Sequence, residues 1–497
     1  GVQGVFAGPL SRAAEMPNIV EANRPSLSWS YERLSAFETR PYSAPWWAKN
    51  CHVNTIVGAL FATPPPAPYR RERFDTPDGD FFVVDFLDSR DQRRPPRGLV
   101  FLYHGLEANT NSPLTMREAW SLAEGGFDVA AISFRGCAGE DNLRPGAYHL
   151  GFTDDVKFLA KTLHERDPTR RMYVTGTSLG GNVMTKLLGE LGDNAADYGI
   201  LGGAVACVPT ADNSAIDGND FNRKVYSGNF LKSLKPKAER QWKRFPEAFD
   251  IERVRNATSM GDFDDAYIAP IYGYKDKNDY YDKNICKYFL NSIRVPLFMI
   301  NARDDPFFDP EKLPSYRDVG EGTVRLVETK EGGHCGYIDG ISSLSLSSVD
   351  AVFAKVFLGK RVQTRAGSAP NGWLADELTR FLIHLDESYE NRLFGRLEQI
   401  ECAQRADREL RGRLVELERR TKELEEERAA LLQERDAEER EKSILRARRQ
   451  AKNDLMARLE RIYTEAERSA RQEIEEAFNQ EGLLSGETPP RIGGGRG

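Results

Sequence analysis

A serine lies between two glycines where a short apolar run gives way to a helical pattern, in the spacing Gly176-x-Ser178-x-Gly180. This spacing is typical of a nucleophile elbow, a strand-to-helix turn with room for little more than glycine on either side of the serine. Such a turn holds the serine hydroxyl clear of the sheet, at the positive end of the following helix. The three-residue pattern is weak alone, and the strand and helix patterns around it give it weight. Ser178 is therefore the predicted nucleophile.

A serine hydroxyl is a poor nucleophile at neutral pH, so a nearby base must take its proton. Among six histidines, His334 stands on a glycine-rich loop after the last apparent strand, where a hydrolytic sheet presents its base. We therefore predict that His334 is the general base. The other five fit packing, loop or surface positions better (His52, His104, His149, His164 and His384).

The imidazole needs a carboxylate to orient it and to stabilise its cation. Asp304 and Asp305 follow the strand pattern of residues 295–301. Ligand sites gather beyond the carboxyl ends of parallel strands, the edge at which Ser178 also emerges. Asp305 is the predicted partner of the histidine, Asp304 is expected to make a structural hydrogen bond or salt bridge, and Asp309 ranks third.

An acyl-transfer intermediate also needs two donors for its oxyanion. One is expected to be the backbone amide of Leu179, directly after the nucleophile. The other is expected from the loop after the first buried strand, where the sequence reads His104-Gly105-Leu106, and we assign it to the amide of Leu106.

The elements that would position these groups alternate along the chain. Apolar strand patterns alternate with helical patterns of 10 to 15 residues, which predicts an α/β fold with a mostly parallel, doubly wound sheet. A Pro-Asp-Gly turn indicates that the first two strands form a hairpin. The strand patterns cover residues 69–76, 81–87, 98–103, 128–134, 171–175, 200–208, 295–301 and 323–328, and helices are expected at 116–124, 154–165, 349–357 and 374–385.

Four regions follow from these patterns. Residues 1–44 read as a loosely held N-terminal extension and residues 45–388 as the catalytic domain. Within the domain, the alternation stops at about 209–292, a helical and aromatic insertion that reads as a small subdomain, as a lid lining an acyl pocket, or as both. Residues 389–480 read as one long charged helix or coiled coil, and residues 481–497 as a flexible tail.

Leucines recur every seven residues in the charged region, which favours a coiled coil and self-association. The companion positions of the heptad are mostly polar, so a solvated helix held by ion pairs remains an open alternative. The leucines are Leu410, Leu417, Leu424 and Leu431.

The composition of the 497-residue chain excludes several classes of protein. A net charge of −7 with interspersed signs implies neither a nucleic acid nor an acidic substrate as partner. Six scattered cysteines without a C-x-x-C pair argue against a zinc site and a disulfide scaffold, and indicate an intracellular compartment. No run approaches the roughly 18 apolar residues of a membrane span. The chain begins at Gly1, which indicates a fragment or processed form.

Several sequence blocks between residues 45 and 360 occur in an order that resembles the α/β-hydrolase superfamily. Within it, they are similar to the YheT-type esterase branch, which includes embryogenesis-associated plant proteins and animal abhydrolase-domain lipid hydrolases. The first block departs from the branch pattern N-G-H-x-Q-T at Cys51 and Asn54. The blocks are Asn50–Ile56, Thr76–Asp80, His104–Leu106, Phe134–Gly139, Gly151–Asp155, Gly176–Asn182, Asp279–Tyr281, Asn301–Pro306 and Gly332–His334.

The resemblance implies an α/β-hydrolase fold and a carboxylic ester hydrolase without metal or organic cofactor. Some relatives act on monoacylglycerols or phospholipids and others on short-chain esters, so contact with a membrane surface is left open. It supports Ser178, Asp305 and His334 as nucleophile, orienting group and base. Two alternatives remain: acyl transfer to an alcohol or thiol by the same triad, and an interaction protein whose hydrolase module is carried by an oligomerising helix.

Overall fold

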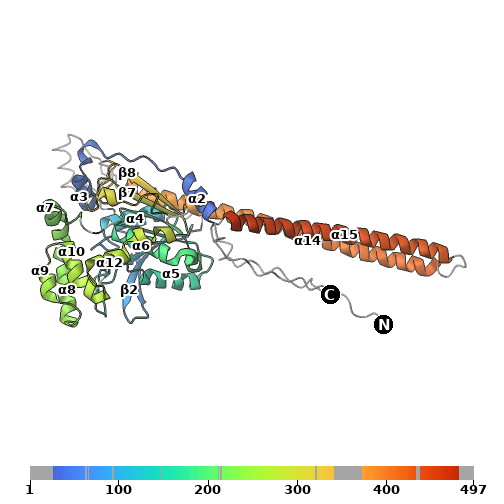
Figure 1. Ribbon diagram of the computed structural model, residues 1–497, viewed down its shortest axis with the longest axis horizontal. Helices are drawn as coiled ribbons and strands as arrows, with labels where there is room; N and C mark the ends of the chain where they lie inside the picture. The colour runs from blue at the N-terminus through green and yellow to red at the C-terminus, as the bar shows by residue number, and fades with distance from the viewer. Residues whose placement is uncertain are drawn as a thin grey trace. The chain divides into compact units, whose positions relative to one another are not determined.

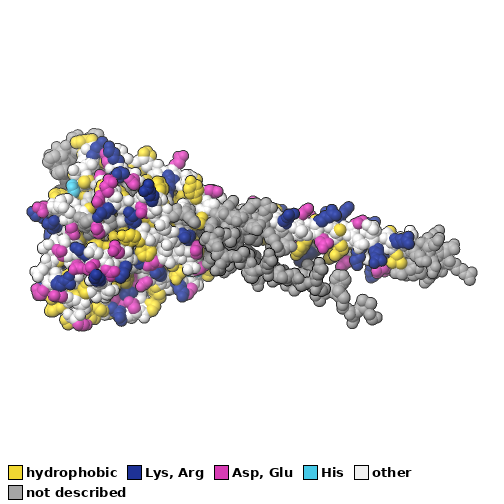
Figure 2. All heavy atoms as spheres, viewed as in Figure 1, with side chains coloured by type: hydrophobic (Ala, Val, Ile, Leu, Met, Phe, Trp, Pro, Cys, Tyr) yellow, Lys and Arg dark blue, Asp and Glu magenta, His cyan; other side chains and the backbone are white. Residues whose placement is uncertain are grey.

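The computed structural model describes residues 26–61, 64, 66–91, 95–146, 148–210, 212, 215–319, 322–340, 372–431 and 437–480. The chain divides into two compact units, Gly1–Ser388 and Tyr389–Gly497. Lysine and arginine side chains alternate with acidic ones over the visible face of the first unit (Figure 2), which fits the interspersed charges of the sequence.

An eight-stranded sheet forms the centre of the first unit (Figure 1), in the order β1-β2-β4-β3-β5-β6-β7-β8. The pairs β1–β2 and β2–β4 are antiparallel, and the remaining pairs are parallel. This is the predicted α/β-hydrolase architecture. The strands are β1 (Arg70–Asp75), β2 (Phe81–Leu87), β3 (Leu99–Tyr103), β4 (Asp128–Ser133), β5 (Met172–Thr177), β6 (Ile200–Ala206), β7 (Leu297–Ala302) and β8 (Val324–Thr329).

The central strands are buried throughout, because helices cover a parallel sheet on both faces and leave no polar side of the strand. Every residue of β3, β5, β6 and β7 is buried. The helices that alternate with the strands are α4 (Pro113–Glu124), α5 (Asp154–Arg166), α6 (Leu179–Leu191) and the 3-10 turns η2 (Gly192–Tyr198) and η6 (Pro310–Lys312).

The N-terminal segment differs from the predicted loose extension. Residues 27–36 form helix α2 (Leu27–Ala36), capped by the Ser26 hydroxyl, which accepts a hydrogen bond from the Trp29 amide. Phe37 after it packs edge-on against the rings of Phe298 and Phe381. Part of the segment that was predicted as a loose extension is therefore helical and packed, and residues 1–25 lie outside the described residues. The turn η1 (Trp46–Ala48) and helix α3 (Cys51–Phe61) follow.

The predicted helical insertion lies between β6 and β7 (green in Figure 1). Its aromatic side chains pack together: Phe249, Phe263 and Tyr267 are all buried. Its elements are α7 (Asp220–Asn222), the π-helical turn η3 (Arg223–Ser227), α8 (Gly228–Arg244), α9 (Ile251–Asn256), α10 (Met260–Phe263), the π-helical turn η4 (Asp264–Ile268), α11 (Ala269–Tyr272), α12 (Lys277–Asn284) and the 3-10 turn η5 (Cys286–Ser292).

The second unit is helical, as predicted, and consists of a pair of helices where the sequence left one long helix or a coiled coil open. Helix α14 (Trp373–Leu431) begins within the first unit, and α15 (Ala437–Gln480) follows it (red in Figure 1). The Arg448 guanidinium donates to the Thr421 carbonyl at 3.1 Å, so α15 runs back along α14. The predicted helix at 349–357 and the predicted tail at 481–497 lie outside the described residues.

Candidate active site

Ser178 occupies a sharp turn between β5 and α6. Its backbone has φ of +55° and ψ of −128°, a conformation that costs a non-glycine residue on the order of 1–3 kcal/mol. The glycines allow the turn to close. A Cβ at Gly180 would lie 2.2 Å from the Tyr103 carbonyl oxygen, and one at Gly176 would lie 2.8 Å from the Gly180 carbonyl carbon. The elbow geometry therefore presents the serine hydroxyl at the carboxyl end of the sheet.

Three side chains from the ends of three strands meet at this edge. The Ser178 Oγ lies 2.8 Å from Nε2 of His334, and Nδ1 of His334 lies 2.8 Å from Oδ2 of Asp305. A neutral imidazole with its proton on Nδ1 satisfies both contacts, accepting from the serine and donating to the carboxylate. The structure thus brings together the three residues that the sequence analysis selected, within hydrogen-bonding distance.

The adjacent carboxylates have different environments. Asp305 is buried, and its Oδ1 accepts the Phe307 amide at 2.8 Å, which leaves Oδ2 facing the histidine. Asp304 instead accepts the amide of Gly333 at 2.9 Å, the structural hydrogen bond expected of it. Asp309 caps η6 by accepting the Glu311 amide.

The loop that carries His334 is held by the ring of Phe307 and by helix α3. The two rings stack with centroids 3.9 Å apart, and the His334 amide donates to Thr55 Oγ1 at 2.8 Å. Asn54 Oδ1 accepts the amide of Ile338 on the far side of the loop. The block at Asn50–Ile56 was recognised in the sequence without a role, and the structure shows that it braces this loop.

The two amides predicted to stabilise an oxyanion lie beside the serine. Leu179 is the first residue of α6, and Leu106 follows Gly105, at which a Cβ would lie 3.3 Å from Cβ of Ser178. Neither amide has an acceptor among the residues that the structure describes. Two unused donors at the wall of the site fit an oxyanion hole.

The group that shapes the Leu106 loop is not evident from the sequence. Glu107 has φ of +56°, unusual for a non-glycine residue. Its amide donates to the Tyr148 hydroxyl at 2.6 Å, and its carboxylate accepts from that hydroxyl and from Lys237 at 2.9 and 2.7 Å. Burial lowers the pKa of Lys237, but the nearby Cys137 and Glu107 raise it by more. The net pKa of Lys237 is therefore above its ordinary value, and the ammonium stays charged. These partners are 41 and 130 residues from Glu107, and no local pattern links them.

His104 shapes the same loop from beneath, as predicted. Its Nε2 accepts the Phe134 amide at 3.0 Å, and its Nδ1 donates to the Gly105 carbonyl at 2.8 Å. Burial lowers its pKa to about 4, so the ring is neutral and spent on structural contacts. The remaining histidines have other partners. Nδ1 of His52 contacts the Tyr226 hydroxyl, Nδ1 of His149 accepts from the Gly151 amide, Nε2 of His384 donates to the Arg33 carbonyl, and His164 lies on α5.

An apolar cavity of about 420 Å³ has Ser178 and His334 on its wall. Much of its lining is hydrocarbon or aromatic, from α3, the insertion and the loop after β7: Ile56, Leu60, Val225, Phe230 and Phe307. Such a cavity suits an acyl chain. Within the described part of the chain, no cluster of three or more side chains could hold a metal ion, and no helix is both long and apolar enough to cross a bilayer.

Comparison with known proteins gives consistent matches. Residues 98–341 match the family model described as the alpha/beta hydrolase fold. The chain is 32% identical over 295 residues to the putative esterase YheT of Escherichia coli, covering 59% of this chain and 85% of that protein. It is 25% identical over 353 residues to phospholipase ABHD3 of Mus musculus, covering 69% of this chain and 84% of that protein. It is 28% identical over 222 residues to the monoacylglycerol lipase of Saccharomyces cerevisiae, covering 42% of this chain and 48% of that protein.

Proposed function

Because this chain belongs to the α/β-hydrolase family, in the branch of the YheT-type esterases, and is a carboxylic ester hydrolase, we propose that Ser178, His334 and Asp305 are its catalytic triad. The observation that carries the proposal is the unbroken hydrogen-bonded chain from Ser178 Oγ through both ring nitrogens of His334 to Asp305, with 2.8 Å at each step.

The reaction proceeds in two halves. His334 takes the serine proton as Ser178 Oγ attacks the ester carbonyl, and the amides of Leu106 and Leu179 stabilise the oxyanion. His334 then protonates the departing alcohol, which leaves an acyl-enzyme. Water activated by the same ring releases the acid, and Asp305 stabilises the imidazolium in both halves.

The substrate we propose is an ester of an apolar acyl chain, either an acyl lipid such as a monoacylglycerol or phospholipid, or a short- to medium-chain ester. The apolar cavity beside Ser178 supports this choice, because burial of each methylene in such a cavity contributes about 0.8 kcal/mol to binding. The names of the phospholipase and monoacylglycerol lipase relatives point in the same direction.

The test is hydrolysis of p-nitrophenyl butyrate and octanoate by three variants. Ser178→Ala should lower kcat by about 10³-fold or more, because no other nucleophile forms the acyl-enzyme. Asp305→Asn should lower it by about 10⁴-fold, since the amide favours the wrong imidazole tautomer. Asp304→Asn is the matched control, and its kcat should stay within about tenfold of the parent's.

Full activity of Ser178→Ala would remove the proposed nucleophile, and equal losses for the two aspartate variants would remove the assignment of Asp305. Added alcohol that competes with water for the acyl group would instead favour the acyltransferase alternative.

A second proposal concerns the helical pair of the second unit. Several large apolar side chains on it are exposed: Val415 by 64%, Met456 by 55% and Tyr463 by 70%. Exposed apolar surface on paired helices favours association with another helix. We propose that this unit assembles copies of the chain.

A further inference from the structure

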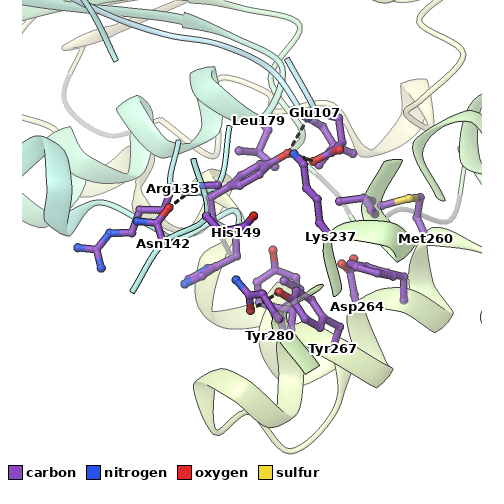
Figure 3. A pocket seen from close by; sticks show the side chains of 18 residues that line it. Glu107, Arg135, Asn142, His149, Leu179, Lys237, Met260, Asp264, Tyr267 and Tyr280 are labelled. Atoms are coloured by element: carbon purple, nitrogen blue, oxygen red, sulfur yellow. Dashed lines mark hydrogen bonds and ion pairs between the residues drawn. The ribbon is translucent and has the colours of Figure 1, made fainter. Parts of the chain in front are cut away.

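Two smaller pockets adjoin the acyl cavity at Ser178. Ser178, Leu179 and Met260 line a pocket of about 70 Å³ that also reaches Asp264 and Tyr280. The same Leu179, Met260, Asp264 and Tyr280 line the next pocket inward, about 50 Å³, which extends to Glu107 and Lys237. Figure 3 shows Lys237 and Glu107 on one side of this inner pocket and Tyr280 and Asp264 on the other. The two pockets form one chamber, which we call the polar chamber.

The polar chamber carries donors and acceptors suited to hydroxyl groups. The Tyr280 hydroxyl accepts the Leu150 amide at 2.8 Å, and its own proton has no acceptor among the described residues. Lys237 has three N–H donors, and its strong contact is with Glu107 at 2.7 Å. The Asp264 carboxylate accepts the Tyr281 hydroxyl at 2.7 Å from the chamber wall. An alcohol hydroxyl both donates and accepts, so it can use either kind of partner.

The charge of the lining disfavours an anion. Three carboxylates, on Glu107, Asp141 and Asp264, outnumber two cations, on Arg135 and Lys237. Arg135 is already bound to Asp155 at 2.6 Å and to Asp78 at 2.7 Å, and its guanidinium points away from the pocket (Figure 3). Lys237 is neutralised by Glu107. A phosphate would therefore enter a chamber with no uncommitted positive charge.

The size of the polar chamber limits its occupant. A cavity needs about 10–15 Å³ to hold one water, so the inner pocket of about 50 Å³ has room for a few heavy atoms. This is enough for a short polyol and too little for a second acyl chain, whereas the apolar cavity offers about 420 Å³.

We propose that the polar chamber binds the alcohol half of the ester and selects a neutral, short polyhydroxylated alcohol such as glycerol over a phosphorylated one. The inference rests on the proposed function, since Ser178 must lie between the two halves of a cleaved ester. The acyl chain lies in the apolar cavity, and the hydroxyls of the leaving group bind Tyr280 and Lys237 before the alcohol departs.

The experiment compares three octanoate esters, those of ethanol, of glycerol at its first carbon, and of glycerol 3-phosphate. They share the acyl chain, so differences in kcat/KM report the alcohol half. Two added hydrogen bonds should make the glycerol ester about tenfold better than the ethyl ester. The phosphate ester should fall about tenfold or more below the glycerol ester.

Tyr280→Phe should reduce the ratio of glycerol ester to ethyl ester about fivefold, because the ring remains and the hydroxyl is lost. Tyr288→Phe is the matched control, since Tyr288 lies in η5, is 61% exposed and does not line the chamber. Its ratio should equal the parent's.

The ratios of the unaltered protein need no variant, so the proposal is tested even if Tyr280→Phe does not fold. A glycerol ester no better than the ethyl ester, with the ethyl ester turned over, would overturn the polar chamber and leave the serine hydrolase standing. A preference for the phosphate ester would also overturn it. Failure to cleave all three esters, or cleavage unaffected by Ser178→Ala, would overturn the proposed function and the chamber with it.

Discussion

Glu118 is the buried carboxyl of the first unit with the clearest consequence for stability. It lies on α4 with 2% of its surface exposed, and burial raises its pKa to about 8 against the opposing pull of Arg117. In the unfolded chain a glutamate has a pKa of about 4.3. At pH values between about 4.3 and about 8, Glu118 therefore keeps its proton in the folded state and loses it in the unfolded state.

The stabilising contribution is complete below about pH 4 and is lost as pH rises to about 8, and the total loss is a few kcal/mol in the free energy of unfolding. Glu118→Gln cannot ionise, so its melting temperature should exceed the parent's by a margin that grows from pH 5 to pH 8. Thermal melts at four pH values measure this margin. Glu124→Gln, at the exposed end of the same helix, is the control, and an offset independent of pH for Glu118→Gln would contradict the prediction.

Individual residues differ in how far the sequence could predict them. Ser178, Asp305 and His334 could be assigned because each follows a recognisable strand and because their chemistry restricts the residue type. Glu107 could not, since its role depends on a positive φ and on Tyr148 and Lys237, which the fold alone brings near.

At the scale of elements, α3 positions the proposed base. Thr55→Val removes the acceptor of the His334 amide while keeping the side-chain shape, so the loop should lose one hydrogen bond of about 1 kcal/mol. We expect kcat for a p-nitrophenyl ester to fall about fivefold. Thr162→Val on α5 is the matched control, because Thr162 makes the same bond to the carbonyl four residues earlier but holds no loop. A similar kcat for both variants would assign the bracing to Asn54 and the stacked Phe307 instead.

The strands were easier to predict than the helices around them. Buried parallel strands are continuous apolar runs, and all eight appear within a few residues of their predicted ends. Helix α2 was missed because its sequence, Leu27–Ala36, buries only Ser30 and Leu34 and so carries a weak apolar period. The reversal between α14 and α15 was missed because no glycine or proline marks it.

At the scale of the whole molecule, the proposed catalytic groups all lie in Gly1–Ser388. A chain ending at residue 395 should therefore hydrolyse p-nitrophenyl esters within about twofold of the full chain. Light scattering should give a monomer for the shorter chain and a multiple of 56.0 kDa for the full one. A monomeric mass for both the shorter and the full chain would contradict the proposed assembly and leave the helical pair as a solvated intramolecular hairpin.

The insertion between β6 and β7 interrupts the chain but not the sheet, since both strands pair in register across it. Ser178, Asp305 and His334 follow β5, β7 and β8, so strand spacing brings them to one edge of the sheet, and α3 braces the loop that carries His334. The interrupting segment supplies about half of the lining of the polar chamber and a smaller part of the lining of the apolar cavity. Replacing this one segment could therefore change the alcohol that the polar chamber prefers, while the strands that carry the three side chains stay in place.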